Sequence, residues 1–208
     1  MPVTIRRYDA VVFDLLTALL DSWTLWNAVA GSAAAGLAWR RTYLVLTYQA
    51  GAYRPYETIV GEAAVLSGLT AAHADELVAR WGELPPWPET CEVTAALARR
   101  VPLAIATNCS ERLGRMAADC AGGPFAVVAT AEGVGYYKPR PEPYRAVLAM
   151  LGTDPARTLF VAGSAADVPG AKGVSMPVFW HNRSGLTPLP GARPDFTEVS
   201  LRPLLELV

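Results

Sequence analysis

The chain has 208 residues, of which 52% are apolar and 18% charged, and its formal net charge is −1. This length suits one domain or a core domain with an insertion, and high apolar content with low net charge excludes a disordered chain. Because 18 basic residues face 19 acidic ones, bulk basicity cannot drive nucleic-acid binding, and no nucleic-acid partner is expected.

The sequence carries no signal for export or for membrane insertion. The opening segment MPVTIRRYDA has arginines but no apolar core of a signal peptide. No apolar stretch reaches the ~18–20 residues that span a bilayer. The three cysteines, Cys91, Cys109 and Cys120, are widely spaced and fit reduced thiols better than a disulfide framework. We therefore expect a cytoplasmic location and no membrane partner.

Five short apolar runs predict strands. They are continuous rather than alternating, which is typical of strands that are covered on both faces. The predicted strands are Ala10–Phe13, Pro102–Thr107, Phe125–Ala129, Leu159–Ala162 and Pro177–Trp180.

A long helical segment follows the first strand. Residues 22–84 show only helical periodicity, which predicts helices over Ala33–Gln49, Tyr56–Leu66 and Ala71–Trp81, the last capped by Thr70. The segment ends in a proline-rich stretch at residues 83–88, which we interpret as a hinge. We expect residues 22–88 to form an all-helical cap, inserted into a core made of residues 1–21 and 89–208.

Helices also separate the later strands. Ser110 is a suitable N-cap for a helix that Gly122 and Gly123 end, and Pro141 opens a helix that ends at Gly152. This alternation of strands and helices predicts an α/β fold with a doubly wound parallel sheet.

Polar residues follow four of the predicted strands, and ligands of such sheets bind at the carboxyl ends of the strands. Asp14 follows the first strand, Thr107 and Asn108 the second, Lys138 the third and Asp167 the fourth. Taken singly, the aspartates could cap turns and the lysine could be solvated. Together they bring two carboxylates, a hydroxyl, an amide and one of only two lysines in the chain to one rim.

This ordered set resembles the four motifs of the haloacid dehalogenase superfamily, and within it the L-2-haloacid dehalogenases. Residues 38–44 resemble their substrate-binding helix, with Arg40 at the position of a functional arginine. Residues 138–144 have their lysine-to-tyrosine spacing, and residues 179–185 resemble their C-terminal segment. The resemblance implies a Rossmann-like core with a helical cap and a homodimer, to which the cap helices could contribute an interface.

Two positions argue against the phosphatases of that superfamily. Leu16 stands where they carry a second aspartate, and Gly163 stands where their fourth motif is acidic. Because Mg²⁺ usually needs a carboxylate-rich site, we expect no metal and no other cofactor. The isolated His73 and His181 form no cluster with zinc-ligand spacing.

The resemblance implies a two-step reaction on a small anionic carboxylic acid. Asp14 attacks C2 of a 2-haloacid, halide leaves, and water hydrolyses the resulting ester to a 2-hydroxy acid. Lys138 would keep Asp14 ionised and offset the repulsion between two anions, which is roughly 4 kcal/mol at 4 Å and an effective dielectric of 20. Arg40 would polarise the halogen or seat the leaving halide, and Asp167 would orient or deprotonate the water.

The resemblance also implies a set of substrate-binding residues. The backbone amides of Leu15 and Leu16, together with Thr107, would hold the substrate carboxylate, and Asn108 would face the halide. Tyr144 would steer Lys138 or the substrate, Leu16 and Leu44 would line the apolar part of the pocket, and Ser164 occupies a further binding position.

The sequence departs from the dehalogenase pattern at three positions. Ala18 replaces a threonine four residues after the nucleophile, although Thr17 is adjacent, and Ala162 and Ser164 replace a serine and an asparagine of the fourth motif. Two alternatives therefore stay open. One is the same covalent chemistry on a different small electrophilic acid, such as a strained cyclic acid, and the other is a non-catalytic binding protein.

Overall fold

The computed structural model describes residues 7–208, so most of the opening segment MPVTIRRYDA, in which no signal peptide is expected, lies outside the described residues. It contains one six-stranded sheet of order β3-β2-β1-β4-β5-β6, in which every neighbouring pair is parallel. The strands are β1 (Ala10–Phe13), β2 (Leu103–Thr107), β3 (Phe125–Thr130), β4 (Thr158–Ala162), β5 (Val178–His181) and β6 (Phe196–Glu198). The five predicted strands are confirmed to within one residue at each end, and β6 was not predicted.

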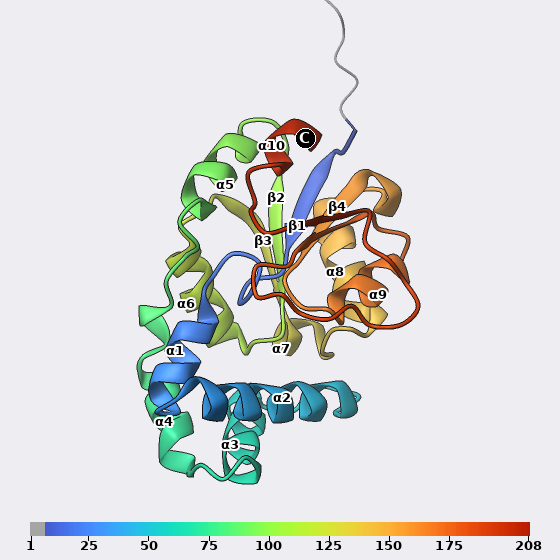
Figure 1. The fold of residues 1–208 in the computed structure, drawn as a ribbon. Coiled ribbons are helices and arrows are strands. Elements are labelled where there is room, and N and C mark those ends of the chain that lie inside the picture. Colours follow the sequence, from blue (N-terminus) through green and yellow to red (C-terminus); the bar gives the residue numbers. More distant parts are fainter. Residues whose placement is uncertain (1–6) are drawn as a thin grey trace, which may run out of the picture.

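Helices cover both faces of the sheet, as the continuous apolar strands require (Figure 1). Val11 and Phe13 of β1 pack with α5, α6 and α10, whereas Val12 packs on the other face with α8 and α9. These helices, with the short α7, are α5 (Thr90–Ala98), α6 (Glu111–Ala121), α7 (Ala131–Val134), α8 (Pro141–Leu151), α9 (Asp167–Lys172) and α10 (Leu204–Leu207); a 3₁₀ turn, η2 (Pro155–Arg157), precedes β4. The predicted doubly wound α/β architecture is therefore confirmed.

The predicted start and stop signals of α6 and α8 are confirmed. Ser110 caps α6, since its Oγ accepts a hydrogen bond from the backbone N of Leu113. Both helices end at a glycine with left-handed backbone, Gly122 at φ +65° and Gly152 at φ +64°, a conformation that costs glycine little.

Four helices lie beyond the carboxyl ends of the strands (Figure 1). They are α1 (Ser22–Val29), α2 (Ala33–Gln49), α3 (Tyr56–Leu66) and α4 (Ala71–Ala79), followed by the 3₁₀ turn η1 (Trp81–Glu83). The bounds of α2 and α3 are those predicted, and α4 ends before Trp81. Buried aromatic rings join α1, α2 and α3. The ring centroid of Trp26 lies 4.7 Å from that of Trp39 and 5.5 Å from that of Tyr43. The ring centroids of Tyr43 and Tyr56 are also 5.5 Å apart.

The chain enters and leaves this helical segment at one place. Leu20 pairs with Pro86 in an isolated antiparallel bridge. The backbone N of Asp21 donates to Pro85 O at 2.8 Å, and that of Trp87 donates to Leu19 O at 3.0 Å. These contacts support the proposal that residues 22–88 form a cap on a core of residues 1–21 and 89–208. Within residues 7–208, no helix combines the length and apolarity needed to cross a membrane.

Candidate active site

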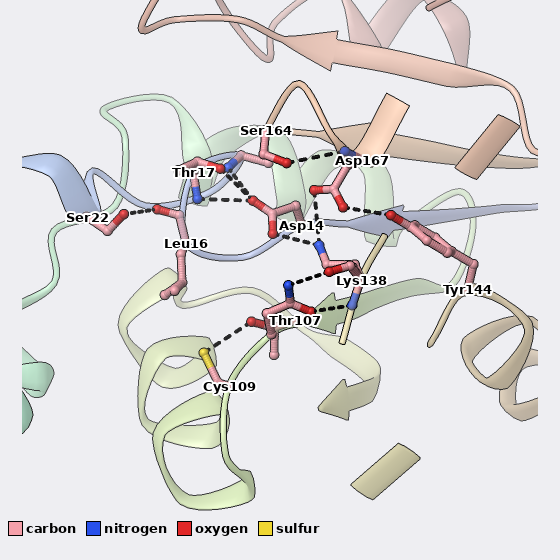
Figure 2. Close-up of polar contacts among 12 residues, drawn as sticks. Asp14, Leu16, Thr17, Ser22, Thr107, Cys109, Lys138, Tyr144, Ser164 and Asp167 are labelled. Atoms are coloured by element: carbon pink, nitrogen blue, oxygen red, sulfur yellow. Dashed lines mark hydrogen bonds and ion pairs between the residues drawn. The ribbon is translucent and has the colours of Figure 1, made fainter. Parts of the chain in front are cut away.

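A buried lysine joins two buried carboxylates at the carboxyl ends of the strands (Figure 2). Lys138 Nζ lies 2.8 Å from Asp14 Oδ1 and 3.1 Å from Asp167 Oδ2. The exposed fractions are 3% for Lys138, 8% for Asp14 and 3% for Asp167. Buried charges of this kind are stable only when they are paired, and removal of one partner typically costs about 3–5 kcal/mol.

Main-chain and side-chain contacts hold the two carboxylates of this triad. Asp14 N donates to Val161 O at 2.9 Å, which extends the β1–β4 pairing to Asp14. The hydroxyl of Tyr144, on α8, donates to Asp167 Oδ1 at 2.7 Å. Lys138 lies in the loop before α8, and its peptide bond to Pro139 is cis.

The environment moves the pKa values of the two carboxyl groups in opposite directions. For Asp14, burial alone would raise the pKa, but the Lys138 charge and hydrogen bonds from Lys138 and Thr17 lower it. For Asp167, burial and the nearby Asp14 charge outweigh Lys138, so its pKa is raised. Burial opposes the charged form of Lys138, yet the two carboxylates raise its pKa. Two carboxyl groups whose pKa values are shifted in opposite directions can take different roles, one as a nucleophile and the other as a base.

The second oxygen of Asp14 accepts three hydrogen bonds from the turn that follows it. Thr17 N donates to Oδ2 at 3.1 Å, Thr17 Oγ1 at 2.7 Å and Ala18 N at 3.3 Å. Thr17 was not predicted as a site residue. The sequence offered one sign of it, since Thr17 lies next to Ala18, which replaces a threonine of the dehalogenase pattern. The sequence does not show, however, in which direction the Thr17 side chain points.

Arg40 reaches the site from α2. Its Nη1 donates to Ser22 Oγ at 2.7 Å, and Ser22 Oγ donates in turn to Leu16 O. Its guanidinium carbon lies 3.9 Å from the centre of the Trp23 ring, a cation–π arrangement. The side chain is buried, and its Nε has no hydrogen-bond partner among the described residues. Arg40 therefore presents a fixed positive charge with a donor still free.

These groups line a cavity of about 130 Å³, which suits a ligand of a few non-hydrogen atoms. Nine predicted site residues line it: Asp14, Leu16, Arg40, Leu44, Thr107, Asn108, Lys138, Ser164 and Asp167. Leu15 packs in the core, so only its backbone could serve a ligand, and Tyr144 lies behind Asp167. Lining residues that were not predicted are Thr17, Trp23, Arg41, Tyr43, Tyr48, Pro139, Ala166 and Leu186.

Three predicted binding residues are engaged within the protein. Asn108 uses both side-chain polar atoms to bind the backbone of Lys138, at 3.0 and 2.7 Å. The Thr107 hydroxyl donates to Cys109 Sγ at 3.2 Å, and Ser164 Oγ accepts from Asp167 N at 3.3 Å. Burial raises the pKa of the Cys109 thiol to about 12, so it is neutral. In residues 7–208 no three His, Cys, Asp or Glu side chains are grouped to hold a metal ion.

Comparison with known proteins gives a consistent set of similarities. A family model described as haloacid dehalogenase-like hydrolase matches residues 8–174. An (S)-2-haloacid dehalogenase from Pseudomonas sp. strain YL is 33% identical over 128 residues, which cover 60% of this chain and 55% of that protein. The chain thus matches about half the length of this relative.

Solved structures resemble the fold over nearly the whole chain. An L-2-haloacid dehalogenase matches with a TM-score of 0.86 and 25% identity, covering 99% of each chain. The L-2-haloacid dehalogenase from Xanthobacter autotrophicus, with chloropropionic acid covalently bound, matches with a TM-score of 0.81 and 22% identity, covering 96% of this chain and 98% of that one.

Proposed function

The chain belongs to the haloacid dehalogenase-like hydrolase family, and we propose that it converts a small 2-haloalkanoic acid to a 2-hydroxy acid and halide without a metal ion. The observation that carries this proposal is the buried Asp14–Lys138–Asp167 triad beside an apolar Leu16. Leu16 cannot protonate a leaving alkoxide, as phosphate ester hydrolysis requires. A halide leaves as a stable anion and needs no proton.

In the first proposed step, Asp14 Oδ1 attacks C2 of the haloacid. An Oδ1–C2 bond forms as the carbon–halogen bond breaks, and the halide departs with the bonding electron pair. Oδ1 is the better placed oxygen because it accepts one hydrogen bond, from Lys138, whereas Oδ2 accepts three. Arg40, with its buried guanidinium and free donor, would receive the halide.

In the second proposed step, water attacks Cγ of the ester and Asp167 accepts its proton. The raised pKa of Asp167, caused first by burial, suits a general base better than an ordinary aspartate would. The Cγ–Oδ1 bond then breaks. The 2-hydroxy acid leaves with Oδ1 and a proton, and the oxygen of water remains in Asp14.

The charge balance of the cavity favours an anionic substrate. Three cationic side chains, Arg40, Arg41 and Lys138, line it with two carboxylates, Asp14 and Asp167. The formal charge is therefore +1, which one carboxylate group would neutralise. The small volume limits the substrate to a short acid.

Halide release from each enantiomer of 2-chloropropionate and 2-bromopropionate tests the proposal. The wild-type protein should release halide from one enantiomer, and mass spectrometry after rapid quenching should detect an ester on the Asp14 peptide. Asp14→Asn should do neither. Undiminished halide release by Asp14→Asn would exclude Asp14 as the nucleophile. Magnesium-dependent phosphate release from simple phosphoesters would support a phosphatase instead.

We also propose that the protein is a cytoplasmic homodimer with no nucleic-acid partner. Exposed apolar side chains on α2 and α3 support an interface through the cap: Val45 is 51%, Val65 57% and Leu66 68% exposed. Light scattering after size-exclusion chromatography should give the mass of a dimer. Leu66→Asp should shift it towards the monomer, while the exposed Met150, on α8, provides a control position.

A further inference from the structure

We propose that Thr17 and the backbone amide of Ala18 form an anion cradle for Asp14 Oδ2, and that Gly163 is the residue that lets the cradle close. This inference rests on the proposed ester chemistry. Thr17 supplies two of the three donors, its amide at 3.1 Å and its hydroxyl at 2.7 Å, and Ala18 N supplies the third at 3.3 Å. A hydroxyl moved by one position thus takes over a contact that Ala18 cannot make with its side chain.

Gly163, at the carboxyl end of β4, leaves the space that this arrangement needs. A Cβ built on Gly163 would lie 2.3 Å from Thr17 Oγ1 and 2.3 Å from Ala18 N. Both distances are far below van der Waals contact, so any side chain at position 163 would displace the cradle from Asp14. Threonine at position 17 and glycine at position 163 therefore form a matched pair.

Two ring nitrogens hold the same turn from behind. Trp87 Nε1 donates to Thr17 O at 3.1 Å, and His181 Nδ1 lies 2.8 Å from Ala18 O. A carbonyl oxygen only accepts, so His181 Nδ1 carries the proton. The two rings meet edge to face with centroids 6.2 Å apart. Thr17 O and Ala18 N belong to one planar trans peptide group and point in opposite directions, so the bond from Trp87 to Thr17 O directs the Ala18 amide towards Asp14.

The cradle acts most strongly during ester hydrolysis. Once Oδ1 is bonded to C2, Oδ2 is the carbonyl oxygen of the ester. Attack by water on Cγ moves the carbonyl electron pair onto Oδ2, and the three donors stabilise that negative charge before the Cγ–Oδ1 bond breaks. Preorganised donors of this kind are each worth about 10²–10³-fold in rate at the upper end.

Thr17→Val tests the cradle, with Thr17→Ser as the matched control. Valine keeps the shape and the amide but loses the hydroxyl, whereas serine keeps the hydroxyl. With 2-chloropropionate, we expect Thr17→Val to lower kcat about 10²-fold and to accumulate the Asp14 ester, and Thr17→Ser to recover most of the rate. Gly163→Ala should reproduce the Thr17→Val phenotype, and the double variant should be little worse than either single variant.

A second measurement does not depend on turnover. In protein labelled with ¹³C at aspartate carboxyl groups, Thr17→Val should raise the pKa of Asp14 and Thr17→Ser should leave it near the wild-type value. If the wild type releases halide and Thr17→Val matches it in rate and in ester level, the cradle inference is wrong. If the wild type neither releases halide nor forms an ester, the proposed function fails. In that case the ¹³C titration alone tests the cradle. A higher pKa of Asp14 in Thr17→Val supports the cradle, and an unchanged pKa overturns it.

Discussion

The side chain of Asn108 is bound at both of its polar atoms by the backbone of Lys138. Asn108 Nδ2 donates to Lys138 O at 3.0 Å, and Asn108 Oδ1 accepts from Lys138 N at 2.7 Å. Asn108 follows β2, and Lys138 lies between α7 and α8. The amide therefore ties the lysine loop to the neighbouring strand end and sets where the ammonium group lies relative to Asp14.

Asn108→Ala should reduce kcat more than it changes the affinity for halide. The loss of two hydrogen bonds of about 1 kcal/mol each should also lower the free energy of unfolding by about 2 kcal/mol. Steady-state kinetics with bromide as product inhibitor, and urea unfolding, would measure both effects. A large rise in the bromide inhibition constant at unchanged kcat would instead show that Asn108 contacts the halide.

Arg40→Lys should lower kcat/KM about 10²-fold, equivalent to about 2.7 kcal/mol of transition-state stabilisation. A lysine cannot both stack on Trp23 and donate to Ser22 as the planar guanidinium does. Arg41→Gln is the matched comparison, because Arg41 lines the same cavity but is exposed. The fall in kcat/KM for Arg41→Gln should be less than tenfold and should become smaller as salt is added. Equal losses in the two variants would contradict a special role for Arg40.

Tyr144→Phe should move the acidic limb of the pH–kcat profile to higher pH. Asp167 must be ionised to accept a proton from water, so activity falls as pH drops through its pKa. Burial already raises that pKa, and the Tyr144 hydroxyl opposes the rise by donating to the carboxylate. Removal of the hydroxyl should raise the pKa of Asp167 further and move the limb to higher pH; the limb reports the two coupled carboxylates as a pair. A shift towards lower pH would contradict this assignment.

Glu89→Gln should destabilise the fold at neutral pH and much less in acid. Burial alone would raise the pKa of Glu89, but hydrogen bonds from Arg183, Leu201 N and Ser200 lower it from an ordinary value of 4.5 to about 2. Such a depressed pKa stabilises the folded state fully above about pH 4.5, and the contribution is lost as pH falls towards 2. Urea unfolding should show a wild-type advantage of about 3 kcal/mol at pH 7 that narrows below pH 4.5. A constant difference across pH would refute this origin.

Local sequence signals were sufficient for most of the fold. Buried parallel strands are continuous apolar runs, and α6 and α8 have explicit caps, so both could be located without long-range information. The strand β6 (Phe196–Glu198) was missed because it is short and half-exposed at the sheet edge, which leaves no apolar run. The helix α5 was not predicted, because the residue at its N-cap, Glu89, is not one of the types that mark the start of a helix.

The candidate site was predicted less completely than the fold. The order of the strand ends indicated Asp14, Lys138 and Asp167, because parallel strands bring their carboxyl ends to one edge. The orientation of Thr17 and the clearance at Gly163 depend on contacts between residues that are about 145 positions apart in the chain. The contact of His181 with Ala18 O is equally long-range, so no local pattern in the sequence indicates it. Sequence spacing places a residue on a rim, but the direction of its side chain depends on packing.

The chain leaves the core at Leu20 and returns to it at Pro86, and these two residues are paired. Since the chain leaves and re-enters the core at paired positions, the intervening segment can change in length or be exchanged without shifting the register of any strand. Asp14, Lys138 and Asp167 all come from outside that segment, whereas Arg40 comes from within it. If the proposed function holds, a change in residues 22–88 can alter substrate preference and leave the three proposed reacting groups in place.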